Sequence, residues 1–339
     1  MLITRWRIPV APADRQREIA PDPAFAMPCD DTDGAGADPG PRRNRAASPP
    51  TRLLVLVNRN SRRGAAFDAA MVAPLVEAGI EPIVETCDAP AEVSARIVAA
   101  AAEFDGVAIA GGDGTLNSAA AGLVATGLPL GILPFGTAND LANTLGIPED
   151  PAEAARVIAR GHTRRIDLGE VNGCYFFNVA SVGLAAELTR QLTGERKRRW
   201  GRLAYPLTAL RALFDMRPFH ADVVTPAERT RVLTLQITVG NGRHYGGGMT
   251  VAEAAEIDDG QLDLFSLELR SPWLLVRMLA DLRRGSHGSW REVRVSRGAG
   301  FEIRTRRSRQ VSCDGELITT TPARFRVRPA AVTVYAPSP

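Results

Sequence analysis

The chain has 339 residues, 45% of them hydrophobic, with four cysteines and a formal net charge of +3. This length and apolar content suit two domains with separate cores and fit neither a peptide-like scaffold nor a wholly disordered chain. The scattered cysteines form no CxxC pair, so neither a disulfide framework nor a zinc site is indicated. The small net charge disfavours a protein that binds nucleic acid.

Residues 1–50 are rich in proline, glycine and aspartate and cannot bury enough apolar surface to fold. We expect a disordered tail or an upstream start-site extension. No apolar run reaches the roughly 18 residues needed to span a bilayer. The sequence therefore predicts a cytoplasmic protein whose membrane contact is peripheral.

Ordered structure is expected from Leu53, where the apolar run LLVLVN resembles a strand buried on both faces. Further strands are expected at 80–86, 106–112 and 128–135, alternating with helices at 91–104, 115–127 and 139–146. Strands that alternate with helices indicate a parallel sheet covered on both sides. We expect this nucleotide-binding domain to occupy residues 51–160.

After about Arg160 the sequence changes to short alternating runs separated by glycine turns, which is typical of an antiparallel sheet or sandwich. Helical segments interrupt it at 204–216 and 272–285. The predicted fold is an α/β parallel-sheet domain followed by an all-β sandwich over 161–339, whose last strand could pack back on the first domain.

The segment GGDGTLN at 111–117 follows an apolar strand and precedes an alanine-rich helix. Its glycines allow a tight turn close to a ligand, and the helix start directs free N–H groups towards an anion. It matches neither GxGxxG nor Walker A, which needs a lysine. Asp113 would repel phosphate, so we assign it to hydrated Mg²⁺. The alternative is a simple turn capped by Asp113.

A second turn of this kind, PFGTAND at 134–140, follows the next strand. Loops after adjacent parallel strands share one sheet edge, so both turns can face one ligand. A third segment that could line the same ligand site is NRNSRRG at 58–64, where Arg62 or Arg63 could bind phosphate. The alternative is a solvated loop.

These two turns, with FNVASVGLAA at 177–186, GNGRHYGGGM at 240–249, EIDDGQLD at 256–263 and DGE at 314–316, resemble bacterial diacylglycerol and sphingosine-type lipid kinases. The resemblance extends from Leu53 onward. It implies a nucleotide-binding domain related to NAD kinases and phosphofructokinases, a β-sandwich domain and an active site between them. It also implies transfer of the γ-phosphate of ATP, with Mg²⁺, to a hydroxyl of diacylglycerol or a related lipid.

The same resemblance implies the ATP site. Its residues would be Asn58, Ser61, Arg62, Thr86, Gly111, Gly112, Asp113, Gly114, Thr115, Leu116, Asn117 and Thr137.

Two acidic turns complete the implied site. The resemblance places a structural Mg²⁺ on Asp259 and the carbonyls of Glu256 and Gln261, although an Asp-Gly hairpin turn is an alternative. Asp314 or Glu316 would accept the proton of the substrate hydroxyl, acting with Asp113; a plain hairpin turn is again the alternative.

The chain departs from the family pattern at Ser118, where a glutamate is usual, in the first loop, and in lacking lysines near the phosphates. A cationic cluster at 195–200 and the two helical segments are candidates for peripheral membrane docking. The family resemblance implies a homodimer.

Other readings are an NAD kinase-like enzyme with a soluble acceptor and a non-catalytic lipid or nucleotide sensor. A Rossmann oxidoreductase is disfavoured, since no GxGxxG follows the first strand.

Overall fold

The structure, a computed structural model, describes the chain from residue 45 to residue 338 with several gaps. The described ranges are 45–46, 49–59, 67–87, 89–192, 217–242, 244–245, 249–250, 256–268, 290 and 293–338. Most of the expected tail, the cationic cluster at 195–200 and the two helical segments at 204–216 and 272–285 lie outside these residues.

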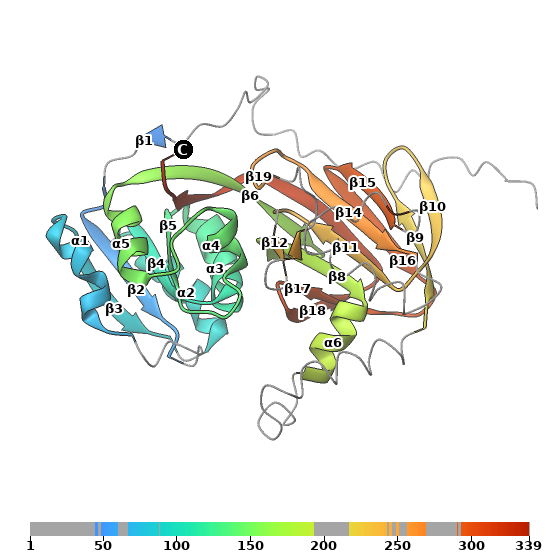
Figure 1. The fold of residues 1–339 in the computed structure, drawn as a ribbon, viewed down its shortest axis with the longest axis horizontal. Coiled ribbons are helices and arrows are strands. Elements are labelled where there is room, and N and C mark those ends of the chain that lie inside the picture. The colour runs from blue at the N-terminus through green and yellow to red at the C-terminus, as the bar shows by residue number, and fades with distance from the viewer. Residues whose placement is uncertain are drawn as a thin grey trace, which may run out of the picture.

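The first domain contains the expected parallel sheet, in the order β5-β4-β2-β3 (Figure 1). The strands are β2 (Arg52–Val57), β3 (Glu81–Thr86), β4 (Gly106–Gly111) and β5 (Leu130–Pro134). β4 and β5 are buried along their whole length, which explains why they are apolar throughout.

Helices cover this sheet in two groups. α2 (Pro90–Ala100) packs against α3 (Asp113–Thr126), whereas the short α1 (Ala73–Glu77), preceded by a 3₁₀ turn at Ala69–Val72, packs against α5 (Pro151–Ala159). Right-handed crossovers place the two groups on opposite faces, because the chain reverses direction across the sheet after β3. The predicted helix over 139–146 is shorter, α4 (Asp140–Thr144).

Two long strands join the domains. β6 (His162–Val171) and β19 (Ala323–Tyr335) run antiparallel to each other. Val334 of β19 also pairs in parallel with Leu130 of β5. The first sheet therefore continues through β19 to β16 (Gly300–Thr305), β9 (Phe219–Val224) and β10 (Arg229–Thr234), with β1 (Arg45–Ala46) and β7 (Cys174–Phe176) beside β6.

A second, antiparallel sheet completes the sandwich. Its order is β15 (Val293–Gly298), β14 (Leu262–Leu267), β11 (Gln236–Gly240), β8 (Val179–Gly183), β17 (Gln310–Cys313) and β18 (Glu316–Thr320). A small pair, β12 (His244–Tyr245) and β13 (Met249–Thr250), stands apart. Phe176, Ile237 and Phe301 lie in the core between the sheets. The predicted fold class is confirmed.

Neither α5 nor α6 (Leu184–Leu192) was predicted from the sequence. α6 follows β8 and packs on β8, β17 and β18 (Figure 1). Among the described residues, no helix is long and apolar enough to cross a membrane.

Candidate active site

The carboxyl ends of the parallel strands form one edge, and most of the predicted nucleotide residues lie along it. Asn58 directly follows β2, and its side-chain amide donates a 2.9 Å hydrogen bond to the Thr115 hydroxyl at the start of α3. Thr86 ends β3 and stands opposite Val57 in the register with β2. This contact and this register bring three separate segments to the same edge.

The two glycine turns contact each other. A Cβ atom added at Gly112 would lie only 2.9 Å from the Cα of Gly136, and one added at Gly111 would lie 2.6 Å from the Cβ of Thr115. The Phe135 N–H donates to the Gly111 carbonyl at 2.9 Å. Because a larger residue at Gly112 or Gly136 would separate these backbones, both glycines are required for the two turns to share one surface.

Asp113, the first residue of α3, lies close to a second acid, Asp140. A carboxylate oxygen of Asp113 accepts a hydrogen bond from the Leu141 N–H at 3.3 Å, and Asp140 is only 6% exposed. Burial, and then the charge of Asp140, raise the pKa of Asp113 above its ordinary value. Two adjacent carboxylates are a donor set that suits Mg²⁺. Asp140 was not among the predicted site residues, although it closes the second motif.

The remaining predicted residues on this edge differ in accessibility. Leu116 is 2% exposed and its side chain belongs to the core of the first domain, so only its backbone lies on the edge. Thr137 is exposed. The side-chain oxygen of Asn117 is buried without a hydrogen-bond partner among the described residues. Ser61 and Arg62 lie outside the described residues.

Asp314 lies in the turn between β17 and β18 and is held by the backbone. It has a left-handed conformation, with φ of 45°. Its carboxylate accepts hydrogen bonds from the N–H groups of Phe177, Asn178 and Val179 at 2.8, 3.1 and 2.9 Å. Asp314 therefore fastens the hairpin to the segment before β8.

The electrostatics of Asp314 link it to the first domain. Burial raises the pKa of Asp314 to about 7, the three N–H donors act in the opposite direction, and the charge of Asp113 raises it further. Asp113 belongs to the first domain, so its charge acts on Asp314 across the domain boundary.

Glu316 also approaches the first domain across this boundary. It begins β18, and its Oε1 would lie 3.0 Å from a Cβ atom added at Gly114. The side chain is exposed, and the partial desolvation that it does experience raises its pKa above the ordinary value. Unlike Asp314, Glu316 lies beside the glycine turn with a carboxylate that faces solvent.

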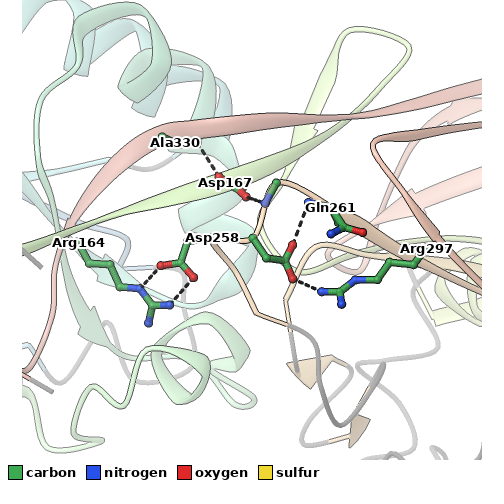
Figure 2. Close-up of polar contacts among 8 residues, drawn as sticks. Arg164, Asp167, Asp258, Gln261, Arg297 and Ala330 are labelled. Carbon is green, nitrogen blue, oxygen red and sulfur yellow. Dashed lines mark hydrogen bonds and ion pairs between the residues drawn. The ribbon is translucent and has the colours of Figure 1, made fainter. Parts of the chain in front are cut away.

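The turn that contains the predicted Mg²⁺ ligands lies elsewhere, between β6 and the second sheet. Asp259 accepts a 2.9 Å hydrogen bond from the Gln261 N–H and forms an ion pair with Arg297 of β15 (Figure 2). Glu256 is exposed. Among the described residues, no three His, Cys, Asp or Glu side chains converge as a metal site. The predicted ion on Asp259 and the two carbonyls stays a prediction.

Comparison with known proteins identifies the family. Residues 52–171 match the model of the diacylglycerol kinase catalytic domain, and residues 178–336 match that of the YegS C-terminal NAD kinase beta sandwich-like domain. A diacylglycerol kinase of Mycobacterium tuberculosis (strain H37Rv) is 32% identical over 299 residues, covering 84% of this chain and 95% of that protein. A diacylglycerol kinase of Bacillus subtilis (strain 168) is 32% identical over 245 residues, covering 71% and 80%.

Solved structures agree on the fold. The crystal structure of a diacylglycerol kinase from Bacillus anthracis (strain Sterne) superposes with a TM-score of 0.73 at 22% identity, covering 86% of this chain and 99% of that one.

Proposed function

The chain belongs to the diacylglycerol kinase catalytic domain family of lipid kinases, and we propose that it transfers the γ-phosphate of ATP to a hydroxyl of diacylglycerol or a related lipid. The observation that carries the proposal is the approach of Glu316 to the backbone of Gly114. It places a carboxylate of one domain beside a phosphate-binding type of turn in the other. Phosphoryl transfer needs such a pairing of acceptor activation with phosphate binding.

The nucleotide lies along the carboxyl edge of the parallel sheet. The N-terminus of α3, which is 14 residues long, faces the phosphates, and the helix dipole favours their charge. Asn58 and Thr115, which already bind each other, form one wall, and Thr86 and Thr137 supply hydroxyls at its ends. The chain has a single lysine, Lys197, so backbone groups and arginine must replace lysine here.

Glu316 is the general base. Its carboxylate is exposed to an approaching substrate and has a raised pKa, so it can accept the proton as the lipid hydroxyl attacks phosphorus. Asp314 has a different task, because the N–H groups of Phe177, Asn178 and Val179 already bind both of its oxygens. Asp314 positions the hairpin that presents Glu316.

Asp113 and Asp140 are the residues that would hold Mg²⁺. The charge of Asp140 disfavours the ionisation of Asp113, and a divalent cation would relieve that repulsion. When bound there, Mg²⁺ neutralises the charge of the phosphates. The two acids come from neighbouring turns, so their spacing depends on the contact between Gly112 and Gly136.

The acceptor resides in a bilayer, and ATP is a solute of the cytoplasm, so the proposed enzyme works at the cytoplasmic membrane surface by peripheral association. The sequence features suited to this docking, at 195–200, 204–216 and 272–285, lie outside the described residues. A homodimer stays a prediction.

The test is transfer of labelled γ-phosphate from ATP in mixed micelles to diacylglycerol, monoacylglycerol and a long-chain base, with NAD as a soluble acceptor. Transfer to one lipid class in the presence of Mg²⁺ supports the proposal and names the acceptor. Transfer to NAD alone would replace it with the soluble-acceptor alternative. ATP binding without transfer to any acceptor would favour the sensor alternative.

A further inference from the structure

Two neighbouring aspartates in the turn at 256–261 bind arginines from different parts of the fold. Asp258 forms a two-pronged ion pair with Arg164 of β6, with distances of 2.8 and 2.6 Å. Asp259 forms an ion pair with Arg297 of β15. Figure 2 shows the two arginines approaching the turn from opposite sides. The turn is thereby attached both to the strand that leaves the first domain and to the edge of the second sheet.

Hydrogen bonds to its backbone also hold this turn in place. Asp167 of β6 is 1% exposed, and its carboxylate accepts 2.6 Å hydrogen bonds from the N–H groups of Gly260 and Ala330 (Figure 2). The Asp167 N–H donates to the carbonyl of Ile257 at 2.8 Å. The Ile257 side chain lies in the core of the first domain. The turn thus links the first domain to the sandwich.

The surroundings of Asp259 leave little room for a resident metal ion. One carboxylate oxygen accepts the Gln261 N–H, and the other binds the Arg297 guanidinium. The Arg297 Nε is also 3.5 Å from a carboxylate oxygen of Asp263, which is 8% exposed. One guanidinium therefore serves two carboxylates. Mg²⁺ binds oxygen at about 2.0–2.1 Å in near-octahedral geometry, so it would have to displace this arginine.

We propose that Arg297 is the permanent cation of this turn and takes the place of the structural Mg²⁺ that the family resemblance implies. With Arg164 it forms a metal-free clamp between the domains. A guanidinium suits this role because its planar, fixed donors can bridge two carboxylates and it keeps its charge at any physiological pH. The proposal is independent of the kinase reaction, because it concerns a different site.

The experiment is thermal unfolding of the full chain without nucleotide, after EDTA treatment and again with added MgCl₂. The first comparison is between wild type and Asp259→Asn. If Arg297 fills the site, both proteins respond equally to Mg²⁺, since any response comes from another site. A Tm increase in wild type that is smaller or absent in Asp259→Asn would overturn the proposal.

The second comparison removes the arginine. Arg297→Gln leaves two carboxylates together, so its Tm falls by a few degrees and its response to Mg²⁺ becomes larger than that of wild type. The matched control is Arg294→Gln, which removes an exposed arginine of the same strand that pairs with Glu268; its response should equal that of wild type. If Arg297→Gln fails to fold, Arg297→Lys takes its place. Its ammonium keeps the charge but lacks the fixed donors that bridge two carboxylates, so its response to Mg²⁺ should also exceed that of wild type. A response to Mg²⁺ equal to that of wild type, in whichever of these variants folds, would contradict the proposed role.

Discussion

Glu316 and Gly114 lie against each other across the domain boundary, with 3.0 Å between the Glu316 Oε1 and the position of a Cβ atom on Gly114. The glycine leaves space for the carboxylate beside the first turn of α3. Since Gly114 lies next to Asp113, this contact sets the geometry between the proposed base and the proposed metal-binding acid.

Gly114→Ala should reduce kcat while leaving stability unchanged or slightly higher. The added methyl displaces the Glu316 carboxylate, whereas alanine suits the helical backbone better than glycine. We expect a loss of about tenfold or more, because small misplacements of catalytic groups are costly. Gly122→Ala is the contrast, since its methyl would lie 2.7 Å from the Ser94 carbonyl oxygen. It should lower Tm, and kcat per folded molecule should change less than in Gly114→Ala. A larger loss of kcat in Gly122→Ala than in Gly114→Ala would contradict the proposed role of the contact between Glu316 and Gly114.

Asp314→Ala should destabilise the protein. It leaves three backbone N–H donors without their acceptor, and each unsatisfied buried donor costs about 1–3 kcal/mol. Glu316→Gln should leave the free energy of unfolding within about 0.5 kcal/mol of wild type, as exposed substitutions usually do. Urea titration of both variants measures the difference. Equal stabilities would show that Asp314 does not hold the hairpin.

The pH profile should reflect the raised pKa of Glu316. A general base works only when deprotonated, so kcat rises with pH through the pKa of Glu316. Desolvation favours the protonated form, which places this acid limb above the ordinary glutamate value of 4.5. Steady-state rates at saturating ATP and lipid, measured across pH, locate the limb. An acid limb at or below 4.5 would exclude the proposed environment.

Asp140→Asn should raise the Mg²⁺ concentration needed for half-maximal activity. It removes one of the two adjacent carboxylates and also the charge that raises the pKa of Asp113. Glu149→Gln, an exposed acid in the loop after α4, serves as the control for lost negative charge. Mg²⁺ titrations of activity compare the variants. If Glu149→Gln raised this Mg²⁺ concentration as much as Asp140→Asn does, the effect would come from the loss of negative charge in general and not from loss of a metal ligand.

The sequence was sufficient for features that depend on local pattern. Apolar runs predict β2, β4 and β5, and the glycine turns after β4 and β5 predict the edge where Asn58 meets Thr115. Local pattern could not predict which arginine would bind which aspartate. Arg164 and Asp258 are 94 residues apart and meet only through the packing of whole strands.

The sequence pattern also could not distinguish the role of Asp314 from that of Glu316. Both belong to the same short segment, and an Asp-Gly pair reads equally well as a hairpin turn. Their difference depends on the backbone of Phe177 to Val179, which reaches Asp314 from a distant part of the chain. The proximity of Asp140 to Asp113 likewise depends on the packing of two turns that are separate in the sequence, so local pattern could not predict it.

The most direct test of the central claim is transfer of the γ-phosphate of ATP to diacylglycerol by wild type and Glu316→Gln, with ATP affinity measured in both. The account predicts a loss of about 10²–10⁴ in kcat with an unchanged Kd for ATP, because the variant lacks only the proton acceptor. A variant that keeps wild-type kcat would contradict the proposal that this carboxylate, held beside Gly114, activates the lipid hydroxyl.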